Sequence, residues 1–242
     1  WDKWLWDIRQ CFRGDKDPLG DLDEQNREFD NEGDYWRWNG GELPESLSSR
    51  PLFTMGHKAT ISFGIVIAHH SVPMAIALEN LWEAEEEAKA QKYHNGCLIK
   101  DKKKCYAQKD AVQVRILYGN GNILKATCKF DVFHQWQELI AIPGLDSAIF
   151  EQAATIWNQH PAPIYEAIEP WTNAFCSRRE ALKDDKSMRE KFQELLIQFL
   201  QGLWLTTESG TECDQQINNW LKVAAFLIRN RDIDIKLGGE RQ

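Results

Sequence analysis

The chain of 242 residues is 43% hydrophobic and 27% charged, which is typical of one large or two ordinary globular domains and unlike a disordered chain. No apolar run approaches the roughly 20 residues that cross a bilayer, and the charged start resembles no signal peptide, so we expect a cytoplasmic protein. The formal net charge of −8 argues against a chain that binds nucleic acid by itself, because phosphate binding relies on Lys and Arg.

Residues 1–12 (WDKWLWDIRQCF) predict an amphipathic helix, since their apolar residues recur at three- and four-residue spacing. The pattern begins without a capping residue, and we interpret the chain as the C-terminal piece of a longer protein or as the product of a split gene. Residues 13–57 are rich in Asp, Gly, Asn and Pro. They predict a long surface insertion with little regular structure.

Residues 60–68 (TISFGIVIA) predict a strand with two unlike faces, because side chains alternate along a strand. One face is bulky and carries Ile61, Phe63, Ile65 and Ile67. The other is small and carries Thr60, Ser62, Gly64, Val66 and Ala68. A glycine flanked by hydroxyl groups allows close approach by something flat, either a ligand or another backbone. Ser62 and Gly64 are therefore candidate binding residues.

The strand ends on two adjacent histidines, His69 and His70, and Pro73 follows. Neighbouring strand residues point in opposite directions, so we do not expect both imidazoles to face one metal ion. We favour a structural role in which they form hydrogen bonds at the corner between strand and helix. The alternatives are that one of them lines a ligand pocket or takes part in catalysis.

Residues 74–92 predict a helix with a buried stripe and an acidic face. The expected stripe consists of Leu78, Leu81, Trp82 and Ala88. The side expected to face water consists of Glu83, Glu85, Glu86 and Glu87. Lys89 lies near the end of the helix, where the helix dipole favours a cation; alternatively, it could reach a triphosphate above the sheet.

After a lysine-rich loop (CLIKDKKKC, 97–105), the sequence predicts a second strand and a hairpin. Val112, Val114 and Ile116 alternate with polar residues, and the turn YGNGN leads into ILKAT. The turn lacks the pattern of a phosphate-binding loop. The six cysteines are scattered with no CxxC pair, so neither a zinc site nor a disulfide framework is expected.

The rest of the chain predicts a helical bundle. The expected helices span 130–141, 146–159, 163–182, 186–205 and 212–230. The fold class is therefore α+β, with a small mixed sheet in residues 1–128 and an all-helical domain in residues 129–242.

Two stretches, ATISFGIVIAHHSVPMAIALENLWEAEEEAKA and KDAVQVRILYGNGN, resemble the second Palm domain of the large subunit of type III CRISPR effector complexes, especially the Cmr-type branch. In that family a strand of the form S-x-G-I-V-I-x-H precedes a short loop with proline, a helix ending in Ala-Lys, a Lys-Asp step and a strand. The resemblance covers about residues 58–122. The helical remainder is similar, more loosely, to the family's C-terminal bundle.

The resemblance implies a ferredoxin-like, nucleotide-cyclase-like half-sheet followed by the bundle. It also implies antiviral defence, the synthesis of cyclic oligoadenylates from ATP with Mg²⁺, and contacts with small helical subunits near the guide–target RNA duplex. Ser62 matches the serine that would contact adenine, and Lys89 matches the lysine near the phosphates. His69 matches the strand-end histidine, for which no chemical role follows.

The Gly-Gly-Asp-Asp turn that holds the magnesium ions in synthesising members of the family does not occur in this chain. The resemblance implies that these ligands lie outside it. We therefore expect half of an ATP pocket, built with Ser62, Gly64 and Lys89, together with a scaffold surface. The alternatives are a non-catalytic assembly module of the same complex and an unrelated GGDEF-like signalling domain.

Overall fold

The computed structural model describes four continuous stretches of the chain and several isolated positions. They are residues 59–91, 109–179, 185–207 and 210–230, with Leu5, Ile8, Arg9, Phe12, 29–31, 35–38, 52–53, Met55 and Leu182. Among these residues, none of the helices is both long and apolar enough to cross a membrane.

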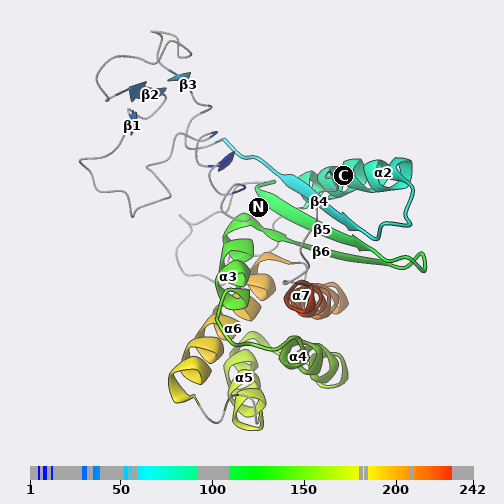
Figure 1. Ribbon diagram of the computed structural model, residues 1–242. Coiled ribbons are helices and arrows are strands. Elements are labelled where there is room, and N and C mark those ends of the chain that lie inside the picture. Colours follow the sequence, from blue (N-terminus) through cyan, green and yellow to red (C-terminus); the bar gives the residue numbers. More distant parts are fainter. Residues whose placement is uncertain are drawn as a thin grey trace, which may run out of the picture.

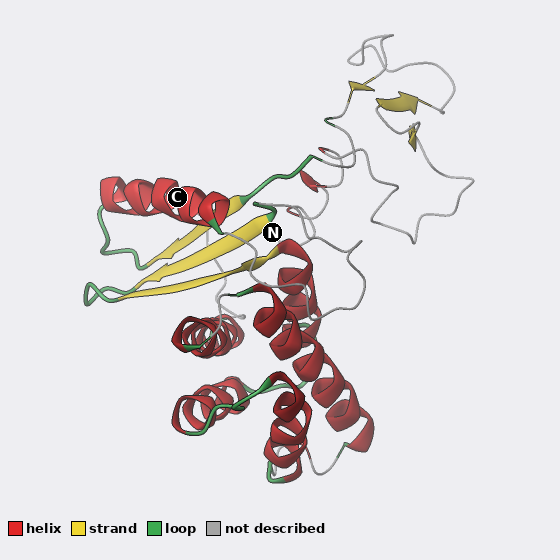
Figure 2. Cartoon of the chain, turned by 180° about the vertical axis from the view of Figure 1, so that it is seen from behind, coloured by secondary structure: helices red, strands yellow, loops and turns green. Residues whose placement is uncertain are grey.

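The central element is a mixed sheet of three strands in the order β4-β5-β6. Strands β4 (Phe63–Ala68) and β5 (Ala111–Leu117) are parallel, and β6 (Ile123–Lys129) pairs with β5 in the antiparallel direction. Helix α2 (Met74–Ala90) makes the crossover from β4 to β5 and covers one face of the sheet, whereas the other helices lie on the opposite side (Figures 1 and 2). The α+β class is confirmed.

The hairpin between β5 and β6 forms where the sequence predicts it. Gly121 has a φ of 85°, a left-handed conformation that glycine adopts without the steric cost of a Cβ. Its backbone N–H donates to the Tyr118 carbonyl at 3.0 Å, and the Asn120 side-chain oxygen accepts from the Asn122 N–H at 3.0 Å.

The second half of the chain is helical, with boundaries close to those predicted. The helices are α3 (Phe130–Ile140), α4 (Ser147–Gln159), α5 (Ile168–Ser177), α6 (Lys186–Thr206) and α7 (Thr211–Arg229). Asp146 and Asp185 cap α4 and α6, accepting from the N–H groups of Ala148 at 3.2 Å and Met188 at 2.9 Å. The helix predicted at 163–182 is instead a short 3₁₀ turn, Tyr165–Ala167, followed by the shorter α5.

One hydrophobic core joins the sheet to the helices. The side of the sheet facing the helices contributes Val112, Val114 and Ile116, all at most 1% exposed, and the same cluster contains Trp136 and Trp220. The rings of the two tryptophans lie 4.8 Å apart, edge to face. The core is therefore continuous across residue 128, where the sequence suggests a domain boundary.

The helix predicted at the start of the chain is confirmed at its described residues, since Leu5, Ile8, Arg9 and Phe12 are helical. Arg9 is 5% exposed and donates to both carboxylate oxygens of Asp110, at 2.8 and 2.6 Å. This bidentate pair fixes the helix against the start of β5.

The described residues of the expected insertion include short strands. Three short strands, β1 (Phe29–Asn31), β2 (Tyr35–Trp38) and β3 (Leu52–Phe53), form an antiparallel sheet of their own. This sheet lies apart from β4-β5-β6 in both views (Figures 1 and 2). Apart from these strands and Met55, residues 13–57 lie outside the described residues, so the prediction of little regular structure there stays a prediction.

The buried face of α2 was predicted only in part. Ala88 is buried as predicted and Leu81 is partly buried, but the other buried residues are Asn80 and Ala84, and Leu78 and Trp82 are 40% and 67% exposed. The sheet face below α2 carries Gly64 and polar side chains, so it accepts only small or hydrogen-bonding residues from the helix. The larger apolar residues point outward instead.

Candidate functional site

Helix α2 approaches the sheet closely at Gly64. A Cβ added there would lie 2.7 Å from the Glu85 nitrogen, 2.9 Å from the Leu81 oxygen and 3.0 Å from the Ala84 Cβ. Real Cβ atoms do not approach other atoms so closely, so Gly64 is required for packing. Of the two alternatives for the small face of β4, the structure therefore shows a neighbouring backbone at Gly64 rather than space for a ligand.

The other two candidate nucleotide-binding residues have different surroundings. The Ser62 hydroxyl oxygen is buried and has no hydrogen-bond partner in the described structure. Lys89 forms an ion pair with Glu85, one helical turn earlier, and both side chains are about half exposed. No hydrogen bond or ion pair joins Lys89 to a described residue of the sheet.

His69 and His70 lie at the exposed corner after β4. Their rings are 4.1 Å apart, so the prediction that they point in opposite directions was wrong. The alternation of a strand ends at Ala68, where the chain turns. Hydrogen bonding at this corner is confirmed for His69, whose Nδ1 lies 2.7 Å from the Ser71 hydroxyl oxygen. In the described part of the chain, no three His, Cys, Asp or Glu residues are grouped as a metal ion would require.

A buried polar network fills the layer between α2 and the sheet, and sequence reasoning missed it. Its centre is Arg115, whose side chain is 0% exposed. Arg115 donates to Gln113 Oε1 at 2.7 Å, to Asn80 Oδ1 at 3.0 Å and to Glu83 Oε2 at 2.6 Å, and its Nη2 lies 3.0 Å from Glu87 Oε1. The sequence did contain a signal for a polar layer on one face of β5, because Gln113 and Arg115 alternate with the apolar residues of VQVRI.

Gln113 extends this network across the sheet. Its amide nitrogen donates to Glu87 Oε2 at 2.8 Å and to the Thr127 hydroxyl at 2.7 Å. Burial alone would raise the pKa of Glu87, but this hydrogen bond and the positive charges of Arg115 and Lys125 hold the pKa below its ordinary value. Glu87 is therefore ionised at neutral pH and its charge is compensated.

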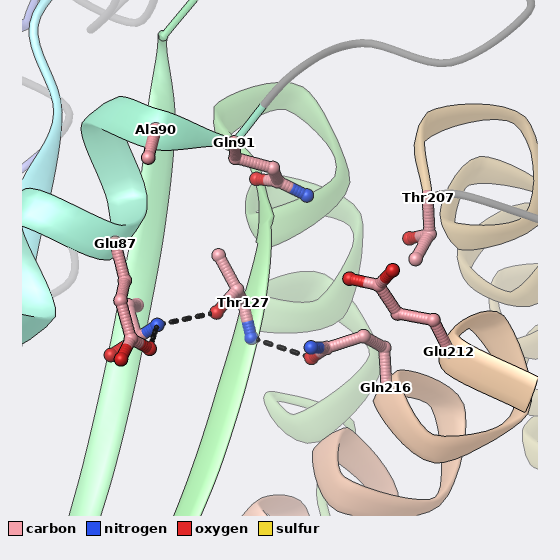
Figure 3. Close-up of a pocket in the computed structure, with 8 residues that line it drawn as sticks. Glu87, Ala90, Gln91, Thr127, Thr207, Glu212 and Gln216 are labelled. Atoms are coloured by element: carbon pink, nitrogen blue, oxygen red, sulfur yellow. Dashed lines mark hydrogen bonds between the residues drawn. The ribbon is translucent and has the colours of Figure 1, made fainter.

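A pocket of about 320 Å³ opens at the end of this network (Figure 3). Its walls come from the C-terminal end of α2, from β5 and β6, and from the junction of α6 and α7. The residues that line it are Glu87, Ala90, Gln91, Gln113, Thr127, Thr207, Glu212 and Gln216. Nearly all of these side chains are polar, which distinguishes the pocket from a packing defect in an apolar core.

Helix α7 also closes one edge of the sheet. Gln216 Oε1 accepts from the Thr127 backbone N–H at 2.8 Å, and the Asn219 amide donates to the Lys125 carbonyl at 2.7 Å. These side chains take the place of a further strand beside β6. Strand β4, in contrast, pairs only with β5 within the described residues.

No protein-family model and no curated protein matches this chain.

Proposed function

We propose that this chain is the second-Palm and helical part of the large subunit of a type III CRISPR effector complex, and that it acts there as an assembly module. The proposal is supported by the order of the elements: a parallel β4–β5 pair crossed by α2, an antiparallel β6, and then helices. The order along the chain of strand, helix, strand, strand and then helices supports it, although a ferredoxin-like split βαβ unit would place the antiparallel strand between the two parallel ones, and here β4 and β5 are direct neighbours. The site of action would be the cytoplasm, in antiviral defence.

The observation that carries the assembly function is the outer surface of α2. Met74, Leu78 and Trp82 are 73%, 40% and 67% exposed and recur every four residues, so they form one apolar stripe on the helix. A contiguous exposed apolar surface is a mark of a protein–protein contact. Strand β4 pairs on its outer side with no described residue, so its backbone groups are available there for a partner strand.

The α2 stripe gives the first test. Changing Trp82→Ser should weaken association with the other subunits of the complex, such as the small helical ones, by roughly 30-fold, the effect of removing a central aromatic contact. The free energy of unfolding should change by only about 0.5 kcal/mol, because Trp82 packs little within the chain. Co-purification from the native source and equilibrium unfolding measure the two quantities.

Ile164→Ser is the matched control, because Ile164 is 55% exposed but belongs to the helical part rather than to the stripe. Equal losses of association in both variants would argue against a specific α2 interface. A chain purified from its native source without guide RNA or small subunits would favour the GGDEF-like signalling domain instead.

A second candidate function is half of an ATP pocket, with Mg²⁺ held by ligands outside this chain. The buried, unpartnered hydroxyl of Ser62 favours it, because such a group lacks a hydrogen bond that a ligand could supply. The proximity of α2 to Gly64 and the Lys89–Glu85 pair weigh against it. For this reason we rank it below assembly.

The nucleotide function predicts a loss of Mg²⁺-dependent ATP affinity in Ser62→Ala, by roughly 2- to 10-fold for one hydrogen bond. Lys89→Ala should reduce the affinity at least as much. Calorimetry on the chain joined to its upstream segment measures both. Lys186→Ala is the control, because Lys186 forms a similar exposed pair with Glu190 on a different helix. Unchanged affinity in Ser62→Ala and Lys89→Ala would remove both residues from a nucleotide site.

A further inference from the structure

The pocket between α2, the sheet and α7 contains hydrogen-bonding groups that no described residue satisfies. Thr207 is 5% exposed, and its hydroxyl oxygen has no hydrogen-bond partner in the described structure. The same holds for the side-chain oxygen of Gln91. Both residues line the pocket, from segments far apart in the sequence. A buried polar atom without a partner is destabilising, and a ligand in the pocket would supply the missing hydrogen bonds.

The charge of the pocket indicates which kind of ligand would form these missing hydrogen bonds. Two carboxylates line the pocket, but that of Glu87 already interacts with Arg115 and Lys125. Glu212 forms no ion pair with any described residue. Its place in the first turn of α7 suits a carboxylate, because the helix dipole is positive there. The dipole does not account for the unpartnered oxygens of Thr207 and Gln91.

The three groups are therefore a carboxylate, a hydroxyl and an amide oxygen, and all three accept hydrogen bonds. Figure 3 shows Gln91, Thr207 and Glu212 projecting from separate elements into the same pocket. A bare metal ion is a poor match, since Mg²⁺ requires near-octahedral oxygen ligands, usually including more than one carboxylate or a phosphate, and the described chain offers no cluster of three His, Cys, Asp or Glu side chains. A volume of about 320 Å³ is also that of a small organic ligand rather than an ion.

We propose that this pocket binds a protonated primary amine. An alkylammonium group carries one positive charge and three N–H donors. The charge would face Glu212, and the donors would reach Glu212, Thr207 and Gln91. The amine has two possible sources with the same chemistry, a free polyamine or a lysine side chain of a partner protein. This site is separate from the α2 stripe and does not depend on the assembly function.

Binding to the 242-residue chain is measured by calorimetry with putrescine, spermidine and Nα-acetyl-lysine amide. The neutral analogue 1,4-butanediol has the length of putrescine without its charge. Glu212→Gln keeps the shape of the side chain but removes its charge, and it should weaken amine binding at least tenfold. Thr207→Val is isosteric and should weaken binding several-fold. Because it removes an unsatisfied hydroxyl, it should not lower the melting temperature of the free chain.

Glu169→Gln is the matched control, because Glu169 occupies the first turn of α5 as Glu212 does in α7 but does not line the pocket. Its amine affinity should equal that of the wild type. Tighter binding of putrescine or spermidine would identify a free polyamine, and tighter binding of the lysine derivative would identify a partner's side chain. The proposal is overturned if no amine binds below about 5 mM, if butanediol binds equally well, or if Glu212→Gln behaves like Glu169→Gln.

Discussion

Replacing Gly64 with valine should lower the free energy of unfolding by about 3 kcal/mol or more, the upper range for overpacking a close contact. Any Cβ at this position lies within 3.0 Å of three atoms of α2, and two of them belong to the helix backbone. A backbone cannot rotate away as the end of a long side chain can, so α2 must move off the sheet. Urea unfolding, followed by the fluorescence of the buried tryptophans, measures the loss.

Gly121→Ala is the comparison for this prediction. Gly121 has a φ of 85° with open space around it, so a methyl group there costs only the strain of the left-handed conformation, about 1 kcal/mol. If Gly64→Val were no more harmful than Gly121→Ala, the tight contact between α2 and β4 would not exist in solution. The small face of β4 would then again be open to a ligand.

The second large effect is expected at Arg115. Arg115→Ala should destabilise the chain by about 3–5 kcal/mol, because it leaves a cavity and removes a buried charge that several polar groups share. Asn80 and Gln113 are buried and would each lose a hydrogen bond, whereas Glu83 and Glu87 are half exposed and can be hydrated.

Two further variants separate charge from geometry. Arg115→Lys keeps the positive charge but cannot donate hydrogen bonds in several fixed directions at once. Its loss of unfolding free energy should therefore be smaller than that of Arg115→Ala but greater than zero. Lys125→Ala removes the cation that contacts Glu87 from a side chain 42% exposed, and should cost less than 1 kcal/mol. If Arg115→Ala and Lys125→Ala had equal effects, the network under α2 would contribute no more than a surface ion pair.

The helices and the hairpin could be predicted because their signals are local. The helix expected at 186–205 is α6, Lys186–Thr206, and the aspartate at its N-terminus caps it. The Asn120-Gly121 turn joins two strands whose residues alternate. In these segments, periodicity, caps and turn residues all favour the same structure.

The buried face of α2 could not be predicted from the helix alone. Leu78 and Trp82 are the most apolar residues of their turns, and by composition they belong inside. What excludes them is the sheet face beneath the helix, which carries Gly64 from β4 and Arg115 from β5. The orientation of α2 is therefore determined by residues on two other elements, and no pattern within residues 74–90 contains that information.

The pocket was missed for a related reason. Its lining residues extend from Glu87 to Gln216, and none of them belongs to a motif. From the sequence, Gln91 is expected only to end a helix. Thr207 and Glu212 are expected only to lie near the start of the next helix. Only the packing of α7 beside β6 brings them together, and that packing depends on the continuous core beneath. The resemblance at residues 58–122 stays a prediction, supported by the order of the elements.

The amide side chains of Gln216 and Asn219 occupy the outer edge of β6 and limit how copies of the chain can assemble by strand addition. Identical chains whose sheet has two unpaired edge strands could pair edge to edge without limit and form a fibre. In the β4-β5-β6 sheet one edge is occupied in this way, so within the described residues a strand can be added to this sheet only beside β4. An assembly built by strand addition to this sheet should therefore end at two copies, joined through their β4 strands.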